Sequence, residues 1–200
     1  EEPNLEDYKE FVAIVDRQIE RMNLIVQELR LLSSGETLQL DEFFPYKVVA
    51  EILSEFDQRI REKKLQVRIY FENQDFCVLA DKVLMKQAIS NVIHNALRYS
   101  NEGELVEIVL KKDKLSVKNY GVAIAEEDLE KIFEPFYCVD KSRSKKLGGS
   151  GLGLAITREI IEEHGFSIIA RSQENRHEKI FTEFVICFGG GKDERVDTKS

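Results

Sequence analysis

The chain is poor in the residues that mark several large classes of protein. Tryptophan is absent, and the 200 residues include three cysteines, three prolines, three histidines and two methionines. Cys77, Cys138 and Cys187 are odd in number and far apart, so they indicate neither a disulfide framework nor a zinc site, and reducing cytoplasm is the expected compartment. No apolar run reaches about 18 residues and the start is acidic, so we expect neither a membrane span nor a signal peptide.

An excess of positive charge is also missing. The formal net charge is −8 although 33% of the residues are charged, and this balance disfavours nucleic acid as a main partner. The apolar fraction of 42% is enough for a hydrophobic core, and the length suits one domain with an appendage.

The first 35 residues carry apolar side chains at alternating steps of three and four. The members of this seam are Leu5, Tyr8, Val12, Val15, Ile19, Met22, Val26 and Leu29. The spacing predicts a long helix that begins after Asn4 and ends near residues 33–35. Phe11, Ile14 and Ile25 widen the stripe, which favours a bundle with other helices, including those of a second copy of the chain. A helix that folds back on its own domain is the alternative.

After Gly35 short strands and helices alternate, so we divide the chain into a helix (1–35), a globular domain (36–189) and a flexible tail (190–200). Period-two or short apolar runs predict strands at 38–40, 65–71, 76–80, 104–111, 115–119, 168–172 and 180–188. Period-3.6 runs predict helices at 45–60, 81–99, 126–133 and 152–164. Pro45 opens the first of these helices and Asp81 caps the second.

The stretch Gly148-Gly149-Ser150-Gly151-Leu152-Gly153-Leu154 has four glycines in six positions and runs into the last predicted helix. Glycine removes the Cβ atoms that keep a ligand away from the backbone. The free N–H groups of a helix N-terminus, together with the helix dipole, attract phosphate. A glycine-rich surface turn is the plainer interpretation of this stretch alone.

The predicted helix 81–99 carries a polar stripe beside its apolar face. Asn91, Asn95, Arg98 and Tyr99 lie at i, i+4, i+7 and i+8, hence on one side of the helix. Asparagine is a mediocre helix former, so two of them one turn apart indicate a function, although solvated amides fit the composition equally well.

Three further features lie between this helix and the glycine-rich stretch. They are a glycine-containing turn at 119–124, an aromatic cluster at 133–137 (Phe-Glu-Pro-Phe-Tyr), and a polar, basic segment at 138–147. The last contains Lys141 and Arg143 and has the composition expected of a mobile lid over an anion.

In order and spacing, these motifs resemble the ATP-binding catalytic domain of bacterial sensor histidine kinases, in the GHKL superfamily. The resemblance covers about residues 38–188 and rests on Asn-Val-Ile-His-Asn-Ala-Leu-Arg-Tyr-Ser (91–100), the aromatic cluster and the glycine-rich stretch. It implies the Bergerat fold, an α+β (α/β sandwich) domain in which helices cover one face of a mixed, mostly antiparallel sheet, here preceded by the long helix.

The resemblance also implies roles for individual residues, with ATP and Mg²⁺ as the ligands. Asn95 corresponds to the magnesium ligand, supported by Asn91, and an amide oxygen suits this hard cation. Arg98 corresponds to a residue that meets the phosphates. Lys141 or Arg143 of the lid would replace an arginine that the family often has at position 138. The adenine and phosphate contacts correspond to Tyr99, Asn119, Gly121, Ile124, Phe136, Gly149, Ser150, Gly151, Leu152 and Gly153.

Asn91 separates a kinase from the hydrolases of the superfamily, which have a glutamate at the matching position. An amide cannot take a proton from water, so a GHKL ATPase is disfavoured and phosphate transfer to histidine is expected. His94, His164 and His177 all lie outside the long helix, so the acceptor histidine is expected on a helix outside this fragment. The expected partners are a response regulator and a second copy of the kinase. The expected location is the cytoplasmic side of a protein anchored to the membrane through upstream segments.

Three positions depart from the family pattern. Asn119 and Ala123 replace an aspartate and a glycine of the first glycine box, and Cys138 stands where the family often has an arginine that reaches the γ-phosphate. An amide still accepts a hydrogen bond from adenine, but without charge. These departures keep a second hypothesis open, a degenerate nucleotide-binding or dimerisation module with little kinase activity. Cys138 itself is either an ordinary lid cysteine or a redox-sensitive thiol.

Overall fold

The computed structural model describes residues 38–139, 151–173 and 179–189, and six positions nearer the N-terminus. These six are helical, with exposed side chains: Tyr8, Phe11, Val12, Ile14, Val15 and Ile19. The rest of the helix predicted over residues 4–33 lies outside the described residues, as does the predicted tail.

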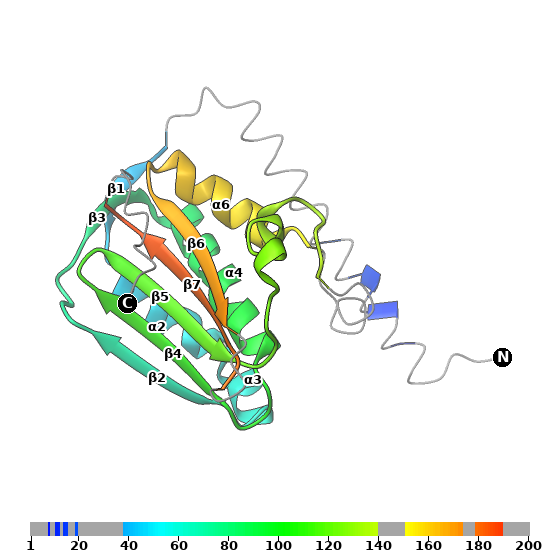
Figure 1. Cartoon of the computed structure of the whole chain (residues 1–200). Helices are drawn as coiled ribbons and strands as arrows, with labels where there is room; N and C mark the ends of the chain where they lie inside the picture. Colours follow the sequence, from blue (N-terminus) through cyan, green and yellow to red (C-terminus); the bar gives the residue numbers. More distant parts are fainter. Residues whose placement is uncertain are drawn as a thin grey trace, which may run out of the picture.

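Five strands form one mixed sheet in the order β2-β4-β5-β7-β6 (Figure 1). Their bounds are β2 Gln66–Phe71, β4 Leu105–Lys111, β5 Lys114–Tyr120, β6 Ser167–Gln173 and β7 Phe181–Cys187. Only the β2–β4 pairing is parallel, because β4–β5, β5–β7 and β6–β7 pair antiparallel. The mixed, mostly antiparallel sheet predicted from the sequence is therefore confirmed.

A separate two-stranded sheet joins β1 (Leu40–Phe43) to β3 (Val78–Asp81). The strand predicted at 38–40 is misplaced, because pairing starts where Leu40 lies opposite Asp81 and continues to Phe43 opposite Val78. Phe43 is 1% exposed, so burial of its ring, three residues beyond the predicted strand, fixes the position of β1.

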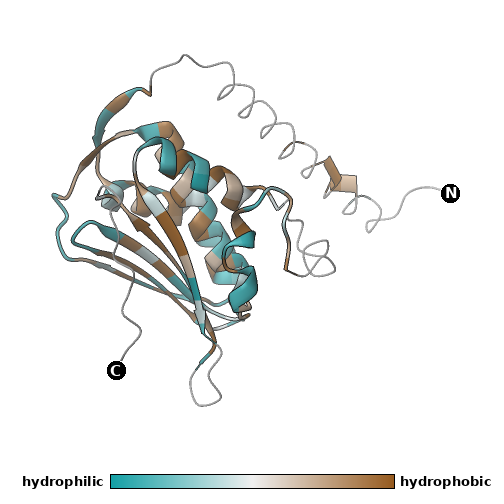
Figure 2. Ribbon diagram, turned by 45° about the horizontal axis from the view of Figure 1, so that its top comes forward, coloured by the Kyte–Doolittle hydropathy of each residue, from teal (hydrophilic) through white to brown (hydrophobic). Residues whose placement is uncertain are grey.

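Four helices cover one face of the five-stranded sheet (Figures 1 and 2). They are α2 Pro45–Glu55, α3 Asp57–Glu62, α4 Lys82–Tyr99 and α6 Gly153–Glu163. The helix predicted over 45–60 is divided at Phe56, whose φ of −99° and ψ of 7° leave the helical region. No helix in the described ranges is both long enough and apolar enough to cross a membrane.

The segment predicted as one helix over 126–133 is instead two 3-10 turns. They are η1 (Glu126–Asp128) and η2 (Lys131–Phe133). Ile132 and Phe133 are buried, and the tighter i→i+3 turn carries both of them into the core directly before Pro135, which cannot donate a backbone hydrogen bond.

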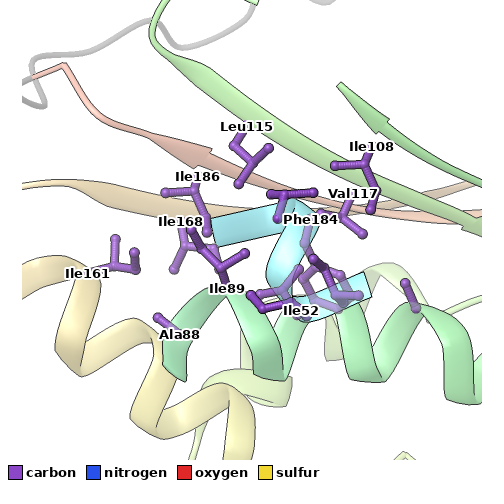
Figure 3. Packing of buried hydrophobic residues seen from close by; sticks show 14 of the residues in the cluster. Ile52, Ala88, Ile89, Ile108, Leu115, Val117, Ile161, Ile168, Phe184 and Ile186 are labelled. Atoms are coloured by element: carbon purple, nitrogen blue, oxygen red, sulfur yellow. The ribbon is translucent and has the colours of Figure 1, made fainter. Parts of the chain in front are cut away.

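The core lies between the helices and the sheet (Figure 3). Strand register aligns apolar side chains in rows, with Ile108 opposite Val117 and Val117 opposite Phe184. Against these rows pack Ile52 of α2, Ile89 of α4 and Ile161 of α6, all fully buried. Each such side chain contributes about 1.5–3 kcal/mol when it leaves water. The layered α+β fold class is confirmed, with α4 as the central helix.

Asp81 fixes the start of α4. Its Oδ1 accepts hydrogen bonds from the backbone N–H groups of Val83 (3.0 Å) and Leu84 (3.1 Å). His164, at the end of α6, accepts from the Asp81 N–H through Nε2 (2.9 Å) and donates from Nδ1 to the Ile160 carbonyl (2.7 Å). The predicted cap is confirmed, and it also ties α6 to the start of α4.

We expect Asp81→Ala to lower the free energy of unfolding by about 1–2 kcal/mol, because two N–H groups of the first turn of α4 lose their acceptor. Urea unfolding followed by circular dichroism measures the change. Asp75→Ala, at an exposed loop position, is the matched control and is expected to change stability by less than about 0.5 kcal/mol. Equal losses in the two variants would contradict a capping role.

Candidate functional site

The polar stripe of α4 faces the N-terminus of α6. Asn91 Nδ2 donates to the Gly153 carbonyl (3.1 Å) and to Thr157 Oγ1 (3.4 Å), across 62 and 66 positions of sequence. A Cβ on Gly153 would lie 3.7–3.9 Å from the Asn91 amide, at van der Waals contact. The structure therefore brings the first asparagine and the last glycine of the two motifs together.

Thr157 orients this amide, and the sequence reasoning missed it. Its hydroxyl is fully buried, donates to the Gly153 carbonyl (2.8 Å), and serves as the second acceptor for Asn91. Both acceptors bond to the Asn91 nitrogen and not to its Oδ1 atom. The signal that was missed is a lone hydroxyl on the apolar face of α6, four residues after Gly153.

Thr157→Val keeps the side-chain volume but removes the hydroxyl, so we expect it to destabilise the domain by about 1 kcal/mol and to loosen Asn91. Thr157→Ser retains the hydroxyl and is expected to keep the orientation of the amide. Urea unfolding measures the stability of both variants, and the side-chain NH₂ signal of Asn91 in a ¹⁵N NMR spectrum reports its contacts. An unchanged Asn91 signal in Thr157→Val would contradict the orienting role.

One turn further along α4, Asn95 is half-buried, and its amide makes no hydrogen bond to another described residue. It lies on the same side of the helix as Asn91. Two amide oxygens one turn apart are ligands that suit a hard divalent cation. Among the described ranges, no cluster of three or more His, Cys, Asp or Glu residues offers another metal site.

Uncompensated positive charge lies near the C-terminal end of α4. Arg98 is 8% exposed, and its Nε and Nη2 atoms have no partner among the described residues. Arg59 of α3 donates from Nη1 to His94 Nε2 (2.7 Å), and the imidazole stacks on Phe56 with centroids 5.4 Å apart. Burial, and to a smaller extent the charges of Arg59 and Arg98, lower the pKa of His94 to about 4. The imidazole is therefore neutral and accepts the hydrogen bond from Arg59.

The turn after β5 packs against the same end of α4. Gly121 forms an isolated bridge with Ser100, and a Cβ on Gly121 would lie 2.0 Å from the Tyr99 carbonyl oxygen. Farther along the turn, the Ile124 N–H donates to Ser172 Oγ (2.9 Å), which fixes its position against β6.

Asn119 lies at the end of β5, on the strand face turned toward the helices. It pairs with Val106 of β4 and Thr182 of β7 in the sheet register. The side chain is 1% exposed, and Nδ2 has no hydrogen-bond partner among the described residues. The structure thus places Arg98, Tyr99, Asn119 and Gly121 at one end of α4.

The aromatic cluster contacts the glycine-rich stretch directly. The Phe136 N–H donates to the Gly151 carbonyl (3.0 Å), and a Cβ on Gly151 would lie 2.9 Å from the Phe136 carbonyl carbon. Phe136 has a φ of 65° and Gly151 a φ of 76°, so both backbones are left-handed where the segments meet. Tyr137 anchors the cluster by donating to Asp128 Oδ1 (2.6 Å), a bond that raises the pKa of the phenol to about 12.

Four predicted site residues lie outside the described residues: Lys141, Arg143, Gly149 and Ser150. The remaining predictions occupy two connected regions. Asn91, Gly151, Leu152, Gly153 and Phe136 lie around the start of α6, and Arg98, Tyr99, Asn119, Gly121 and Ile124 lie around the end of α4 and β5. Asn95 lies on α4 between Asn91 and Arg98.

Comparison with known proteins identifies the family of the chain. Residues 80–188 match the family model described as histidine kinase-, DNA gyrase B- and HSP90-like ATPase. The sensor histidine kinase WalK of Bacillus subtilis (strain 168) is 34% identical over 175 residues, which cover 83% of this chain and 29% of WalK. A WalK sensor protein kinase of Staphylococcus saprophyticus is 32% identical over 86% of this chain and 30% of its own length. The chain therefore spans about 30% of these curated relatives.

Two solved structures share the fold. The catalytic domain of histidine kinase ThkA, in a nucleotide-free form, has a TM-score of 0.60 and 32% identity, and the match covers 75% of this chain and 96% of that one. ThkA in complex with the response regulator protein TrrA has a TM-score of 0.66 and 29% identity, over 93% of this chain and 53% of that one.

Proposed function

Because the chain belongs to the family of histidine kinase-, DNA gyrase B- and HSP90-like ATPases, we propose that it is the ATP-binding catalytic domain of a sensor histidine kinase. It transfers the γ-phosphate of ATP to a histidine on a helix outside this chain. Homology to named histidine kinases and the matching catalytic-domain structures support this choice within the family.

The orientation of Asn91 is the observation that carries the proposal. Its nitrogen is held by the Gly153 carbonyl and the Thr157 hydroxyl of α6, so the residue at this position is a neutral amide and no base. Hydrolysis requires a group that takes a proton from the attacking water, and an amide does not supply one. Transfer to a positioned nucleophile requires mainly orientation and charge neutralisation, which this set of donors provides.

The phosphates would lie at the start of α6. Free N–H groups at the N-terminus of an 11-residue helix, reached through the bare backbone of Gly151 and Gly153, favour an anion there. Arg98 brings a guanidinium with two unpartnered nitrogens, and the predicted contacts at Lys141, Arg143, Gly149 and Ser150 would complete the site.

The oxygens of Asn91 and Asn95 would hold Mg²⁺, which neutralises charge on the phosphates when it is bound. The base would lie at the other end of α4, near Tyr99, Asn119, Gly121 and Ile124, with Phe136 at the edge. Along α4, Asn91 and Tyr99 are eight residues apart, about 12 Å at 1.5 Å per residue. A nucleotide, with phosphates at one end and a base at the other, spans such a distance.

Phosphate transfer in trans tests the proposal. The purified chain is mixed with γ-³²P-labelled ATP, Mg²⁺ and the histidine-bearing helical hairpin of a related kinase, and the label on the hairpin is followed. We expect an acid-labile, base-stable phosphohistidine. A hairpin with the histidine replaced by glutamine is the control. Nucleotide binding without labelling would support the degenerate module instead, and sustained phosphate release without a hairpin would support an ATPase.

The proposal includes partners for the intact protein. ThkA was solved with the response regulator TrrA, so we propose that a response regulator receives the phosphoryl group in this system as well. The six described positions near the N-terminus expose apolar side chains, among them Phe11 at 64% and Tyr8 at 56%, which suits pairing with a second copy. We propose no nucleic-acid partner. The domain would lie on the cytoplasmic side of the membrane, and segments upstream of it would attach the intact protein to the membrane.

A further inference from the structure

Asn119 is a buried polar side chain whose hydrogen bonds the chain does not complete. It is 1% exposed, and its Nδ2 atom has no partner among the described residues. A buried donor without an acceptor lowers stability, so native structures seldom keep one unless something else satisfies it. None of the described residues supplies this acceptor, and a ligand bound beside Asn119 can supply it.

The surroundings of Asn119 place it in the base end of the proposed nucleotide site. The Asn101 N–H donates to the Tyr120 carbonyl (3.1 Å), and Ser100 bridges Gly121, so the end of β5 is fastened to the end of α4. Thr182 lies opposite Asn119 and donates to the Val122 carbonyl (3.1 Å), which occupies its hydroxyl proton. Asn119 thus carries the unsatisfied donor at this position.

The chemistry of the amide decides which base it fits. A carboxylate only accepts hydrogen bonds, whereas an amide offers one acceptor and two donors. Adenine presents an amino donor at position 6 and an acceptor at N1. A 6-oxopurine presents the reverse pair, an oxygen acceptor at position 6 and an N1–H donor. An amide matches either pair after rotation about its last side-chain bond, but a carboxylate facing position 6 repels the oxygen.

We propose that Asn119 makes the proposed nucleotide site accept 6-oxopurine nucleoside triphosphates as well as ATP, so that the base contributes little to selection. The inference rests on the proposed function and adds the substrate class of the same site. Selection among purines at this position then depends on a single side-chain atom, the Nδ2 of Asn119, which donates to the oxygen that a carboxylate would reject.

The wild-type chain tests the inference without any substitution. Isothermal titration calorimetry with Mg²⁺ compares ATP with ITP, because hypoxanthine carries the 6-oxo group without the 2-amino group of guanine. Each base forms the same number of hydrogen bonds with an amide, so we expect dissociation constants within about tenfold of each other. If ATP binds but the dissociation constant of ITP is more than about a hundredfold higher, the inference is overturned and the proposed function stands. Failure of both nucleotides to bind overturns the proposed function itself.

Asn119→Asp sharpens the test, since it is isosteric and replaces the donor with a charged acceptor. We expect ITP affinity to fall more than ATP affinity, so that the ATP-to-ITP ratio rises by at least about tenfold. Asn73→Asp is the matched control, because Asn73 is exposed and its Oδ1 already accepts from the Asp75 N–H (2.9 Å), so the ATP-to-ITP ratio should not change. An unchanged ratio in folded Asn119→Asp also overturns the inference. Thermal unfolding establishes that the variant is folded, and if it is not, the wild-type ratio alone decides.

Discussion

Replacing Gly121 with alanine is expected to lower the free energy of unfolding by about 3 kcal/mol or more and to abolish nucleotide binding. The new Cβ would lie 2.0 Å from the Tyr99 carbonyl oxygen, 3.0 Å from its carbonyl carbon and 3.2 Å from the Ser100 Cα. All three atoms belong to the backbone, so no side-chain rotation relieves the overlap. The end of β5 must move away from the end of α4, which separates Asn119 from Arg98 and Tyr99.

Thermal unfolding and calorimetry with Mg²⁺-ATP measure the two effects. Gly103→Ala is the matched control, because Gly103 has a φ of 76° and nothing lies within 4 Å of the added Cβ. It is expected to lose about 1 kcal/mol from the left-handed backbone alone and to bind nucleotide normally. Gly121 does not have a left-handed φ, so its cost arises from contact only. Similar losses in the two variants would show that the close approach is unimportant.

Local sequence rules predicted most of the elements that form this fold. Asp81 at the start of α4, Pro45 at the start of α2, and the alternating apolar residues of β4 and β5 each determine structure through neighbours in sequence. The same rules misplaced β1, because its position depends on Asp81 and Val78, which lie about forty residues later. They also predicted α2 and α3 as one helix, because the apolar face continues past Phe56 although the helical conformation of the backbone is interrupted there.

The site was predictable only in part, because several of its contacts join residues that are far apart in the sequence. Motif order identified Asn91 and Gly153 as members of one site, and the structure joins them by a hydrogen bond. No rule of spacing indicated that Thr157 would support Asn91, or that Arg59 would bond to His94, because both contacts cross between helices. Burial of Asn119 was likewise invisible, since a strand residue of that type is usually exposed.

These contacts give α4 a distinct role in the site. One helix carries Asn91 at the end proposed for the phosphates and Tyr99 at the end proposed for the base, and each end is fixed by a different partner. The first end is held through Gly153 and Thr157 of α6, and the second through the bridge between Ser100 and Gly121. The spacing of the two ends is therefore set by the length of a helix, while their orientation depends on two separate packing contacts. A change at either contact is expected to disturb one end of the nucleotide first.

Asn91→Asp tests the first of these contacts and is expected to reduce the rate of phosphate transfer by at least about a hundredfold at pH 7. The carboxylate has the shape of the amide but no N–H, so both hydrogen bonds to α6 are lost. Its oxygen would instead face the Gly153 carbonyl oxygen at about the 3.1 Å now measured for the nitrogen, and two acceptors repel each other. The side chain must turn away or α6 must move, and in either case the oxygen proposed to face the phosphates is displaced.

The trans-labelling assay gives the rate, and urea unfolding is expected to show a loss of about 1–3 kcal/mol from the two lost hydrogen bonds. Thr157→Ser, which preserves the hydroxyl, is expected to retain most of the transfer rate and most of the stability. If Asn91→Asp transferred phosphate at the wild-type rate, the amide nitrogen would not be the atom that orients this residue, and the assignment of its oxygen to the phosphate side would fail. Sustained hydrolysis by the same variant would instead show that a carboxylate placed here activates water, and that the amide at position 91 is what restrains this domain to phosphate transfer.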